Sequence, residues 1–189
     1  MTPKLFKRKL FRKVQQKMLG INKVSALDLD TLGQVLILAP HADDETIGAF
    51  TILERVRNVT VCVVTDCSTG EGEQVLDFDA VVTRRENEFK EAMSFFSVDN
   101  IVFNKAIPND QTYLHPKSMQ NLFRKLSVEN FDTIFVPHQH DNHPDHRSLN
   151  LMLKKYLRSK KNSRVSLFGY EVWTPIQFPT NFVAFCADV

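Results

Sequence analysis

The stretch Gln34–Gly48 reads QVLILAPHADDETIG and runs from an aliphatic segment, through a proline turn, into a segment compatible with a helix. Residues 34–39 have the length and composition of one buried strand, and residues 45–57 continue as a helix. A second run, residues 59–65, is rich in β-branched residues and lacks alternation, as expected of a strand covered on both faces. The stretch therefore predicts a strand–loop–helix unit of a parallel sheet.

The remaining chain repeats this alternation of strand and helix. Helical periodicity marks residues 82–96, 117–126 and 149–157, and short strand candidates occupy residues 100–103, 133–136 and 165–173. Such alternation predicts right-handed βαβ units, so we expect a Rossmann-like, three-layer α/β/α fold with a mostly parallel sheet. The 189 residues, 43% hydrophobic and 24% charged, are typical of one globular domain and exclude disordered, collagenous and membrane-spanning classes.

Basic residues are concentrated at the start of the chain. Residues 1–27 hold eight Lys and Arg and no acid, whereas the remainder has 22 acids against 16 bases. Apolar residues recur every fourth position from Phe6 to Met18, which predicts an amphipathic helix. We expect a basic amphipathic leader, residues 1–27, and one domain, residues 28–189. The leader either packs on the domain or contacts anionic lipid through residues 1–23, and no nucleic-acid partner is expected.

The sequence contains no segment expected to cross a membrane or to direct secretion. It has no run of 18 apolar residues, and the leader lacks an uninterrupted apolar core. The three cysteines, Cys62, Cys67 and Cys186, are an odd number without metal-type spacing, which argues against a disulfide framework. We therefore expect a cytoplasmic protein, either free or peripherally attached to a membrane.

Two polar motifs directly follow strand candidates. The first, His41–Glu45, reads HADDE, and the second, Pro137–His146, reads PHQHDNHPDH. Ligands of open parallel sheets bind outside the carboxyl ends of the strands, so we expect the two motifs to meet there. Each motif alone has a simpler interpretation, because acids and proline at a helix start satisfy free amides and complement the helix dipole.

The spacing within the motifs is typical of metal ligands. His41 and Asp44 are three residues apart, as are His143 and His146, which places each pair on one side of a helical turn. Zinc accepts imidazole and carboxylate ligands, and catalytic sites use three of them plus water. The spacing leaves His143 and His146 interchangeable. Asp43 diverges from Asp44 and is free to take a proton from water that the ion acidifies, and the remaining imidazole can stabilise an oxyanion or protonate a departing amine.

At these residues the sequence resembles the LmbE-like (PIG-L) family of metal-dependent N-acetylglucosaminyl deacetylases. The resemblance extends from Gln34 to Pro175 and rests on Pro40–Glu45 and His140–His146, in that order and at that spacing. It implies the following roles: Zn2+ or another divalent metal on His41, Asp44 and His146, Asp43 as general base, and His143 as a stabiliser of the tetrahedral intermediate.

Other positions match the family less closely. Arg85 matches an arginine of the family's second helix that approaches the active site. Asp66 matches an aspartate after the second strand, and Cys67 stands where the family has glycine. We expect Asp145 to orient a histidine, or simply to begin a helix. Trp173 either offers a sugar a flat apolar face or belongs to the core.

The resemblance implies a hydrolase that removes acetyl from an N-acetylated amino sugar of the N-acetylglucosamine type. One alternative keeps the site but acts on the amide of a thiol-sugar conjugate. Another is a catalytically silent metal- or sugar-binding protein, because family members usually continue beyond Val189 through a further strand and a C-terminal helix. A nucleotide-binding domain is disfavoured, since no Gly-x-Gly-x-x-Gly sequence follows the first strand.

Overall fold

The computed structural model describes residues 26–68, 78–160 and 164–173, so the expectations for the leader, for Cys186 and for the segment beyond Trp173 lie outside the described residues. The strands are β1 Val35–Ala39, β2 Val59–Val63, β3 Asn100–Phe103, β4 Thr133–Pro137 and β5 Ser166–Tyr170. The α-helices are α2 Asp44–Arg55, α3 Phe78–Phe95, α4 Pro116–Leu126 and α5 Pro144–Ser159, and the 3-10 helices are η1 Leu29–Thr31, η2 Thr112–Leu114 and η3 Val128–Asn130. None of the helices in these ranges is long and apolar enough to cross a bilayer.

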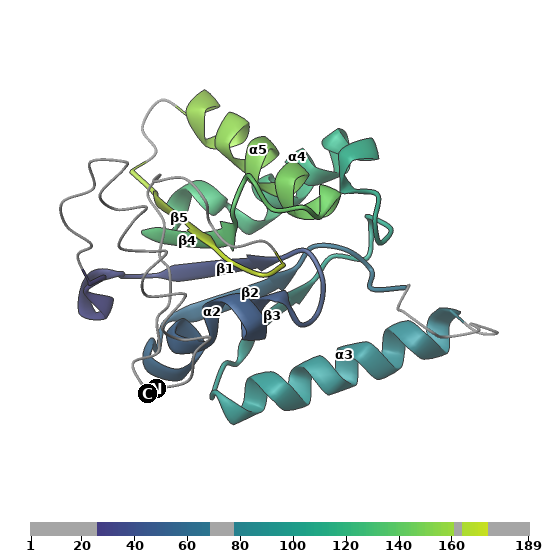
Figure 1. Cartoon of the computed structure of the whole chain (residues 1–189), viewed down its shortest axis with the longest axis horizontal. Coiled ribbons are helices and arrows are strands. Elements are labelled where there is room, and N and C mark those ends of the chain that lie inside the picture. Colours follow the sequence, from purple (N-terminus) through teal and green to yellow (C-terminus); the bar gives the residue numbers. More distant parts are fainter. Residues whose placement is uncertain (1–25, 69–77, 161–163, 174–189) are drawn as a thin grey trace, which may run out of the picture.

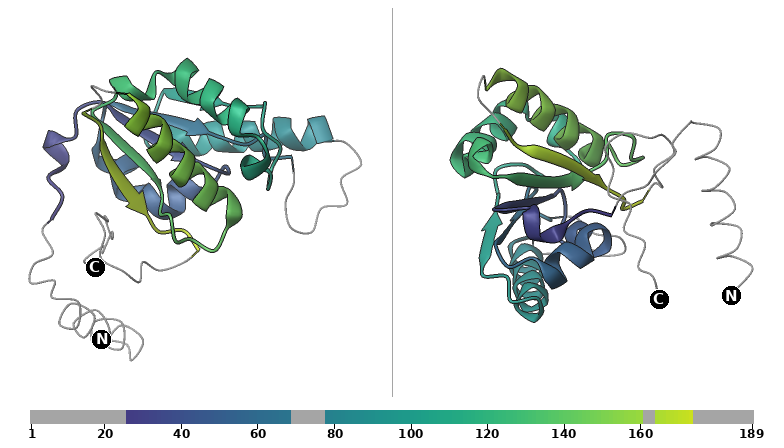
Figure 2. Two further views of the ribbon diagram at one scale, coloured as in Figure 1. Left: turned by 90° about the horizontal axis from the view of Figure 1, so that it is seen from above. Right: turned by 90° about the vertical axis from the view of Figure 1, so that its left-hand side faces the viewer.

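The sheet is parallel throughout and has the strand order β3-β2-β1-β4-β5. Helices α2 and α3 cover one face, and α4 and α5 cover the other (Figures 1 and 2). This arrangement confirms the expected three-layer α/β/α fold. The chain proceeds outward from β1 to β3 and then returns to place β4 on the other side of β1, so the order reverses between β1 and β4. Ligands of such sheets bind at that reversal.

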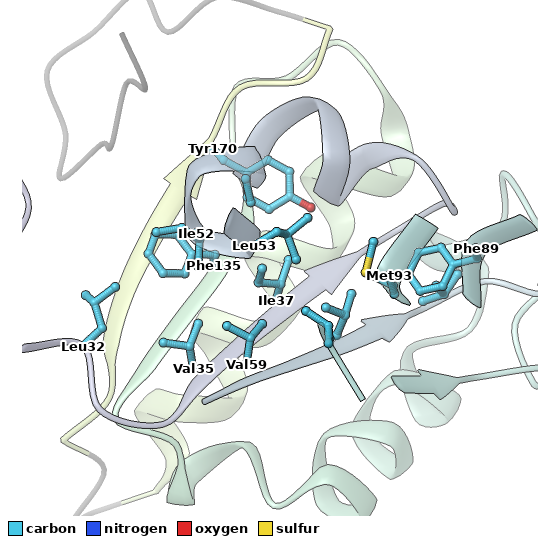
Figure 3. Close-up of a cluster of buried hydrophobic side chains, with 14 of the residues drawn as sticks. Leu32, Val35, Ile37, Ile52, Leu53, Val59, Phe89, Met93, Phe135 and Tyr170 are labelled. Atoms are coloured by element: carbon cyan, nitrogen blue, oxygen red, sulfur yellow. The ribbon is translucent and has the colours of Figure 1, made fainter. Parts of the chain in front are cut away.

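Strand β1 explains why two cores form. All five of its residues are buried, and successive side chains of a strand point to opposite faces. Val35 and Ile37 pack beneath α2 and α3 with Ile52 and Phe135 (Figure 3). Leu36 and Leu38 join the second core, beneath α4 and α5. The uninterrupted aliphatic run is therefore required, because neither face of the strand meets water.

Several element ends differ from the sequence expectation. Strand β2 ends at Val63 because the Thr65 amide and hydroxyl both donate to the Pro40 carbonyl, at 3.1 and 2.8 Å. Helix α5 begins at Pro144, five residues before the predicted start at 149. Proline suits the first helical position because it has no amide proton to leave unpaired. The second motif consequently includes the first turn of α5.

Gly48 allows β5 to approach α2 closely. A Cβ at this position would lie 2.1 Å from Cδ2 of Tyr170 and 2.8 Å from the Glu171 carbonyl oxygen. The Tyr170 ring is fully buried, and its hydroxyl donates to the Leu38 carbonyl at 2.9 Å, so the ring has little freedom to retreat.

We predict that Gly48→Ala lowers the free energy of unfolding by about 1–3 kcal/mol, the usual cost of overpacking a core. Urea unfolding would measure it. Glu54→Ala, at an exposed position of the same helix, serves as the control and should change stability by less than about 0.5 kcal/mol. An unchanged midpoint for Gly48→Ala would contradict the close packing of α2 against Tyr170.

Candidate metal centre and active site

The two motifs meet at the reversal of the sheet. The first occupies the turn from β1 to α2, and the second occupies the turn from β4 to α5. Because β1 and β4 are paired in parallel, with Ile37 opposite Phe135, both turns leave the same edge. The ring centroids of His41 and His146 lie 5.5 Å apart, and those of His41 and His143 lie 4.7 Å apart. The sheet therefore brings together side chains from opposite halves of the chain.

Asp44 joins the two histidines expected to be ligands. Its Oδ2 lies 3.2 Å from Nδ1 of His41 and 3.3 Å from Nε2 of His146. A tetrahedral zinc ion with ligands at 2.0–2.1 Å separates its ligand atoms by roughly 3.3 Å. Asp44 and His146 are buried, and His41 is largely so. These two separations are close to that value, but the histidines whose ligand atoms all lie within 4.8 Å of one another are His41, His143 and His146, so the ligand set that includes Asp44 stays a prediction.

Hydrogen bonding distinguishes His143 from His146. The ligand atoms of His41, His143 and His146 all lie within 4.8 Å of one another, so distance alone admits any of the three. His143 is the N-cap of α5, and its Nδ1 accepts the amide of Asp145 at 3.3 Å. A neutral ring with Nδ1 as acceptor carries its proton on Nε2, which faces Asp110 Oδ1 at 3.2 Å. His143 is therefore arranged as a hydrogen-bond donor, whereas His146 directs a nitrogen toward Asp44.

Asp141 is a site residue that the sequence analysis missed. Its carboxylate is fully buried, and Oδ1 accepts the amide of His143 at 2.8 Å and lies 3.3 Å from Nδ1 of His146. Asp44 and Asp141 lie at ion-pair distance from the two ring nitrogens of His146, and neither nitrogen makes a hydrogen bond with a described residue. A carboxylate behind a ligand imidazole fixes its tautomer and orientation. The available sequence signal was an acid inside the histidine cluster.

Asp145 lies behind the other histidine of the pair. Its Oδ2 is 3.2 Å from Nε2 of His41, and its Oδ1 accepts the amide and hydroxyl of Thr112 at 2.9 and 2.7 Å. Thr112 comes from η2, and nothing in the sequence pattern linked it to the motifs. Each candidate ligand imidazole thus has a second carboxylate at its far nitrogen.

The charges of this cluster shift the pKa values of its members. Burial lowers the pKa of His41, but the carboxylates of Asp145 and Asp44, which accept hydrogen bonds from the imidazole and carry negative charge, outweigh this and raise it to about 9. Burial disfavours the charged form of Asp44, yet the two histidines hold the pKa of that carboxyl far below its usual range. The carboxylates of Asp141 and Asp44 likewise outweigh burial and raise the pKa of His146. Without a metal ion, the imidazoles therefore retain protons that an ion must displace.

Asp43 lies beside the candidate ligands His41 and Asp44. It is the N-cap of α2 but makes no side-chain capping bond, so the simple capping interpretation fails for this residue. Burial, followed by the charge of Asp44, raises the pKa of Asp43, and His41, Arg85 and His146 oppose the shift. A carboxylate with a raised pKa accepts a proton more readily near neutral pH.

Arg85 and Asp66 lie on the α3 side of the site. Together with Ala42 they line a cavity of about 10 Å³, which has room for one water molecule. Asp66 Oδ1 accepts the amides of Ser68 and Asn109 at 3.0 and 3.1 Å, so it holds in place the loop that precedes Asp110. It supports the site and, in this structure, contacts none of the histidines.

Cys67, where the family has glycine, takes the left-handed backbone conformation that glycine adopts easily, with φ of 55°. Its side chain is buried, and burial raises the pKa of the thiol to about 11. The substitution therefore retains the turn at the end of β2 and fills the space beneath it.

Glu45 and Trp173 complete the surroundings of the site. Glu45 is buried, burial raises its pKa to about 7, and its Oε2 has no hydrogen-bond partner among the described residues. The sequence analysis treated it only as an acid at a helix start. Trp173 is 67% exposed, so the core interpretation of this residue is wrong, and its amide donates to Asp141 Oδ2 at 3.3 Å.

Comparison with known proteins relates this geometry to a family. The family model described as PIG-L: GlcNAc-PI de-N-acetylase matches residues 36–157, which include both motifs. No curated protein matches the chain.

Solved structures share the fold at low sequence identity. N,N'-diacetylchitobiose deacetylase from Pyrococcus horikoshii is 22% identical, with a TM-score of 0.59 over 83% of this chain and 61% of that chain. A conserved protein from Thermus thermophilus is 21% identical, with a TM-score of 0.60 over 76% of this chain and 68% of that chain. The zinc-inhibited form of a teicoplanin deacetylase is 14% identical, with a TM-score of 0.55 over 67% of this chain and 64% of that chain. The chain therefore spans about three fifths of the first of these proteins.

We predict that the wild-type chain binds one divalent ion and that the His41→Ala, His146→Ala double variant loses it, because each substitution removes one of the three expected ligands. Elemental analysis after zinc loading and gel filtration would measure it. The control is His140→Ala, an exposed histidine of the same loop, which should retain the wild-type stoichiometry. Equal metal content in the double variant and the control would contradict the convergence of the two motifs.

We predict that zinc affinity rises with pH from neutrality toward about 9. The pKa of His41 is raised to about 9, so at lower pH the ion must expel a proton from this imidazole. Each displaced proton makes the apparent affinity up to about tenfold stronger per pH unit. Competition with a chromophoric chelator across this range would measure the slope, and a pH-independent affinity would contradict a protonated His41 in the metal-free protein.

Proposed function

The chain belongs to the PIG-L family of GlcNAc-PI de-N-acetylases, and on that premise we propose that it is a divalent-metal-dependent hydrolase that removes the acetyl group from an N-acetylated amino sugar. The observation that carries the proposal is the contact of Asp44 with both His41 and His146. Asp43 precedes Asp44 in the chain, and His143 lies one helical turn before His146. This set contains three ligands, a proton acceptor and a hydrogen-bond donor.

In this proposal His41, Asp44 and His146 hold the ion, and Asp145 and Asp141 orient the two imidazoles from behind. A bound divalent ion supplies a Lewis acid that polarises the amide carbonyl and acidifies water. Zinc is the first candidate because imidazole and carboxylate are its usual ligands in catalytic sites.

Asp43 acts as the general base. Its carboxylate takes a proton from the water that attacks the acetyl carbonyl carbon, so a carbon–oxygen bond forms as the carbonyl oxygen becomes negative. When the carbon–nitrogen bond breaks, the same carboxyl returns the proton to the departing amine. Acetate and a free amino sugar are the products. The raised pKa of Asp43 suits both steps, because the carboxylate accepts a proton more readily near neutral pH and the carboxyl group can still give it up.

His143 stabilises the negative carbonyl oxygen. Its Nδ1 accepts the Asp145 amide, so Nε2 carries the proton, and the substrate oxygen takes over this donor from Asp110. Burial and the neighbouring His41 and His146 lower the pKa of His143, and its position at a helix N-terminus also disfavours the cation. A neutral imidazole is therefore present near neutral pH. This favours oxyanion stabilisation over protonation of the amine by the same ring.

The substrate class is proposed from the family and from the site's surroundings. Among proteins of similar fold, one is named a deacetylase of N,N'-diacetylchitobiose and another a teicoplanin deacetylase. In this chain Arg85 borders the site, and the exposed Trp173 is anchored to Asp141, so we assign them to contacts with sugar hydroxyls and with the apolar face of a pyranose. The basic residues 1–23 are proposed to contact anionic lipid, a role that favours a phosphate-bearing or lipid-linked sugar.

We predict that Asp43→Ala lowers turnover of N-acetylglucosamine conjugates by at least about 10²-fold, the usual contribution of a general base. Zinc content should stay at the wild-type value because Asp43 is not a proposed ligand. Acetate release and elemental analysis of the same preparation would measure both quantities. Glu54→Ala, remote from the motifs on the exposed side of α2, should retain full activity.

Two outcomes of this experiment have different meanings. Unchanged acetate release by Asp43→Ala would eliminate the general-base assignment. Zinc bound by the wild type with no acetate released from any N-acetylated sugar of a panel would identify the chain as a silent binding protein and refute the hydrolase proposal.

A further inference from the structure

Helices α4 and α5 expose basic residues and no acidic ones. Helix α4 contains no acid, and the single acid of α5, Asp145, is buried behind His41. The exposed charged residues of the two helices are Lys117, Arg124, Lys125, Lys155 and Arg158. Because the domain as a whole has more acids than bases, this layer carries charge opposite to the average.

The helical periodicity places these bases on one flat side of the molecule. Both helices cover the same face of the sheet, and Phe123 of α4 contacts Tyr156 of α5 with ring centroids 5.4 Å apart. Met119, Leu122 and Phe123 point inward from α4, as do Leu149, Leu153 and Tyr156 from α5. Lys117 and Arg124 are on the opposite side of α4, and Lys155 and Arg158 are on the opposite side of α5. Figure 2 shows the two helices forming one outer layer.

These bases have no acidic partners among the described residues, whereas three bases on the α2–α3 side each pair with an acid. None of the five makes an ion pair with a described residue. On the α2–α3 side, Arg55 pairs with Glu54 at 3.5 Å, Arg84 with Glu88 at 3.8 Å, and Lys105 with Glu86 at 2.6 Å. The α4–α5 side also has one ion pair, Lys160 with Glu129 at 2.7 Å, but the five bases have no such acid beside them, and a group of bases of this kind favours an anionic partner.

The apolar residue in this layer favours a membrane over a nucleic acid. Leu151 is 55% exposed and lies in line with Lys155 and Arg158 on the outer stripe of α5. An apolar side chain between bases can enter the headgroup region while the bases contact anionic headgroups. The exposed part of α4 and α5 offers no aromatic ring on which a nucleic-acid base would stack.

We propose that the outward side of α4 and α5, here called the basic face (Lys117, Arg124, Lys125, Leu151, Lys155 and Arg158), binds the surface of a membrane that contains anionic lipid. His143 is the N-cap of α5 and His146 lies in its first turn, so the candidate active site lies at one end of this face. The surface is separate from residues 1–23, and its binding does not depend on the deacetylase activity.

The test is co-sedimentation of the full-length chain with phosphatidylcholine vesicles that do or do not contain phosphatidylserine. Lys155→Glu with Arg158→Glu should weaken partitioning onto the anionic vesicles by about tenfold or more, since each base near the surface contributes roughly a fivefold effect. The control, Arg55→Glu with Arg57→Glu, changes the net charge by the same amount at exposed positions near the end of α2. It should weaken partitioning onto the anionic vesicles by less than about threefold. Circular dichroism would establish that both variants are folded.

Four results would overturn the proposal. If the Lys155→Glu, Arg158→Glu variant partitioned onto the vesicles as strongly as the wild type, the basic face would be excluded. If binding were lost only when residues 1–23 are deleted, membrane binding would belong to the leader. Equal weakening by the control pair would indicate a net-charge effect. Duplex DNA bound at the same salt concentration as tightly as the vesicles, with the same sensitivity to the two substitutions, would assign the face to nucleic acid.

Discussion

The parallel pairing of β1 with β4 is the constraint on which the rest of the structure depends. The chain first builds β2 and β3 on one side of β1 and then returns to place β4 on the other, which brings the loops after β1 and β4 to one edge. Neither loop could assemble the site alone, because His41 and Asp44 come from the first loop and Asp145 comes from the second. The aliphatic side chains of β1, buried on both faces, hold this pairing in place.

A second theme is how the fold accommodates so many ionisable groups away from water. Buried charges are costly unless they are paired and hydrogen-bonded. Here Asp44 faces two imidazoles, and each of these has a further carboxylate at its far nitrogen, so opposite charges alternate through the cluster. The same alternation supplies oriented ligands to a divalent ion, which would replace the protons that the imidazoles otherwise retain. The requirements for stability and for metal binding therefore coincide.

The loops around the site are held by side chains more than by secondary structure. Asp66 fixes the amide of Asn109, Thr112 binds Asp145, and Cys67 and Asp110 both adopt left-handed backbone conformations, with φ of 55° and 59°. Such conformations are uncommon for residues other than glycine and concentrate at functional sites. In this chain the loop that contains Asp110 brings its carboxylate to Nε2 of His143. The donor that we assign to oxyanion stabilisation therefore depends on contacts from three separate loops.

The sequence by itself determined the class of fold and the two motifs. A five-residue aliphatic run that ends at a proline indicates a strand covered on both faces, because it is too short for a helix. The three-residue spacing of His41 with Asp44 needs only local geometry. The sequence did not distinguish His143 from His146, because both histidines have the same spacing and chemistry. Tertiary structure gives the two rings different surroundings: the Asp145 amide donates to Nδ1 of His143, whereas the carboxylates of Asp44 and Asp141 lie at the two ring nitrogens of His146 and favour its protonated form. It also determined the positions of Asp141, Thr112 and the buried Glu45, since a side chain's protonation and orientation depend on groups that only folding brings to it.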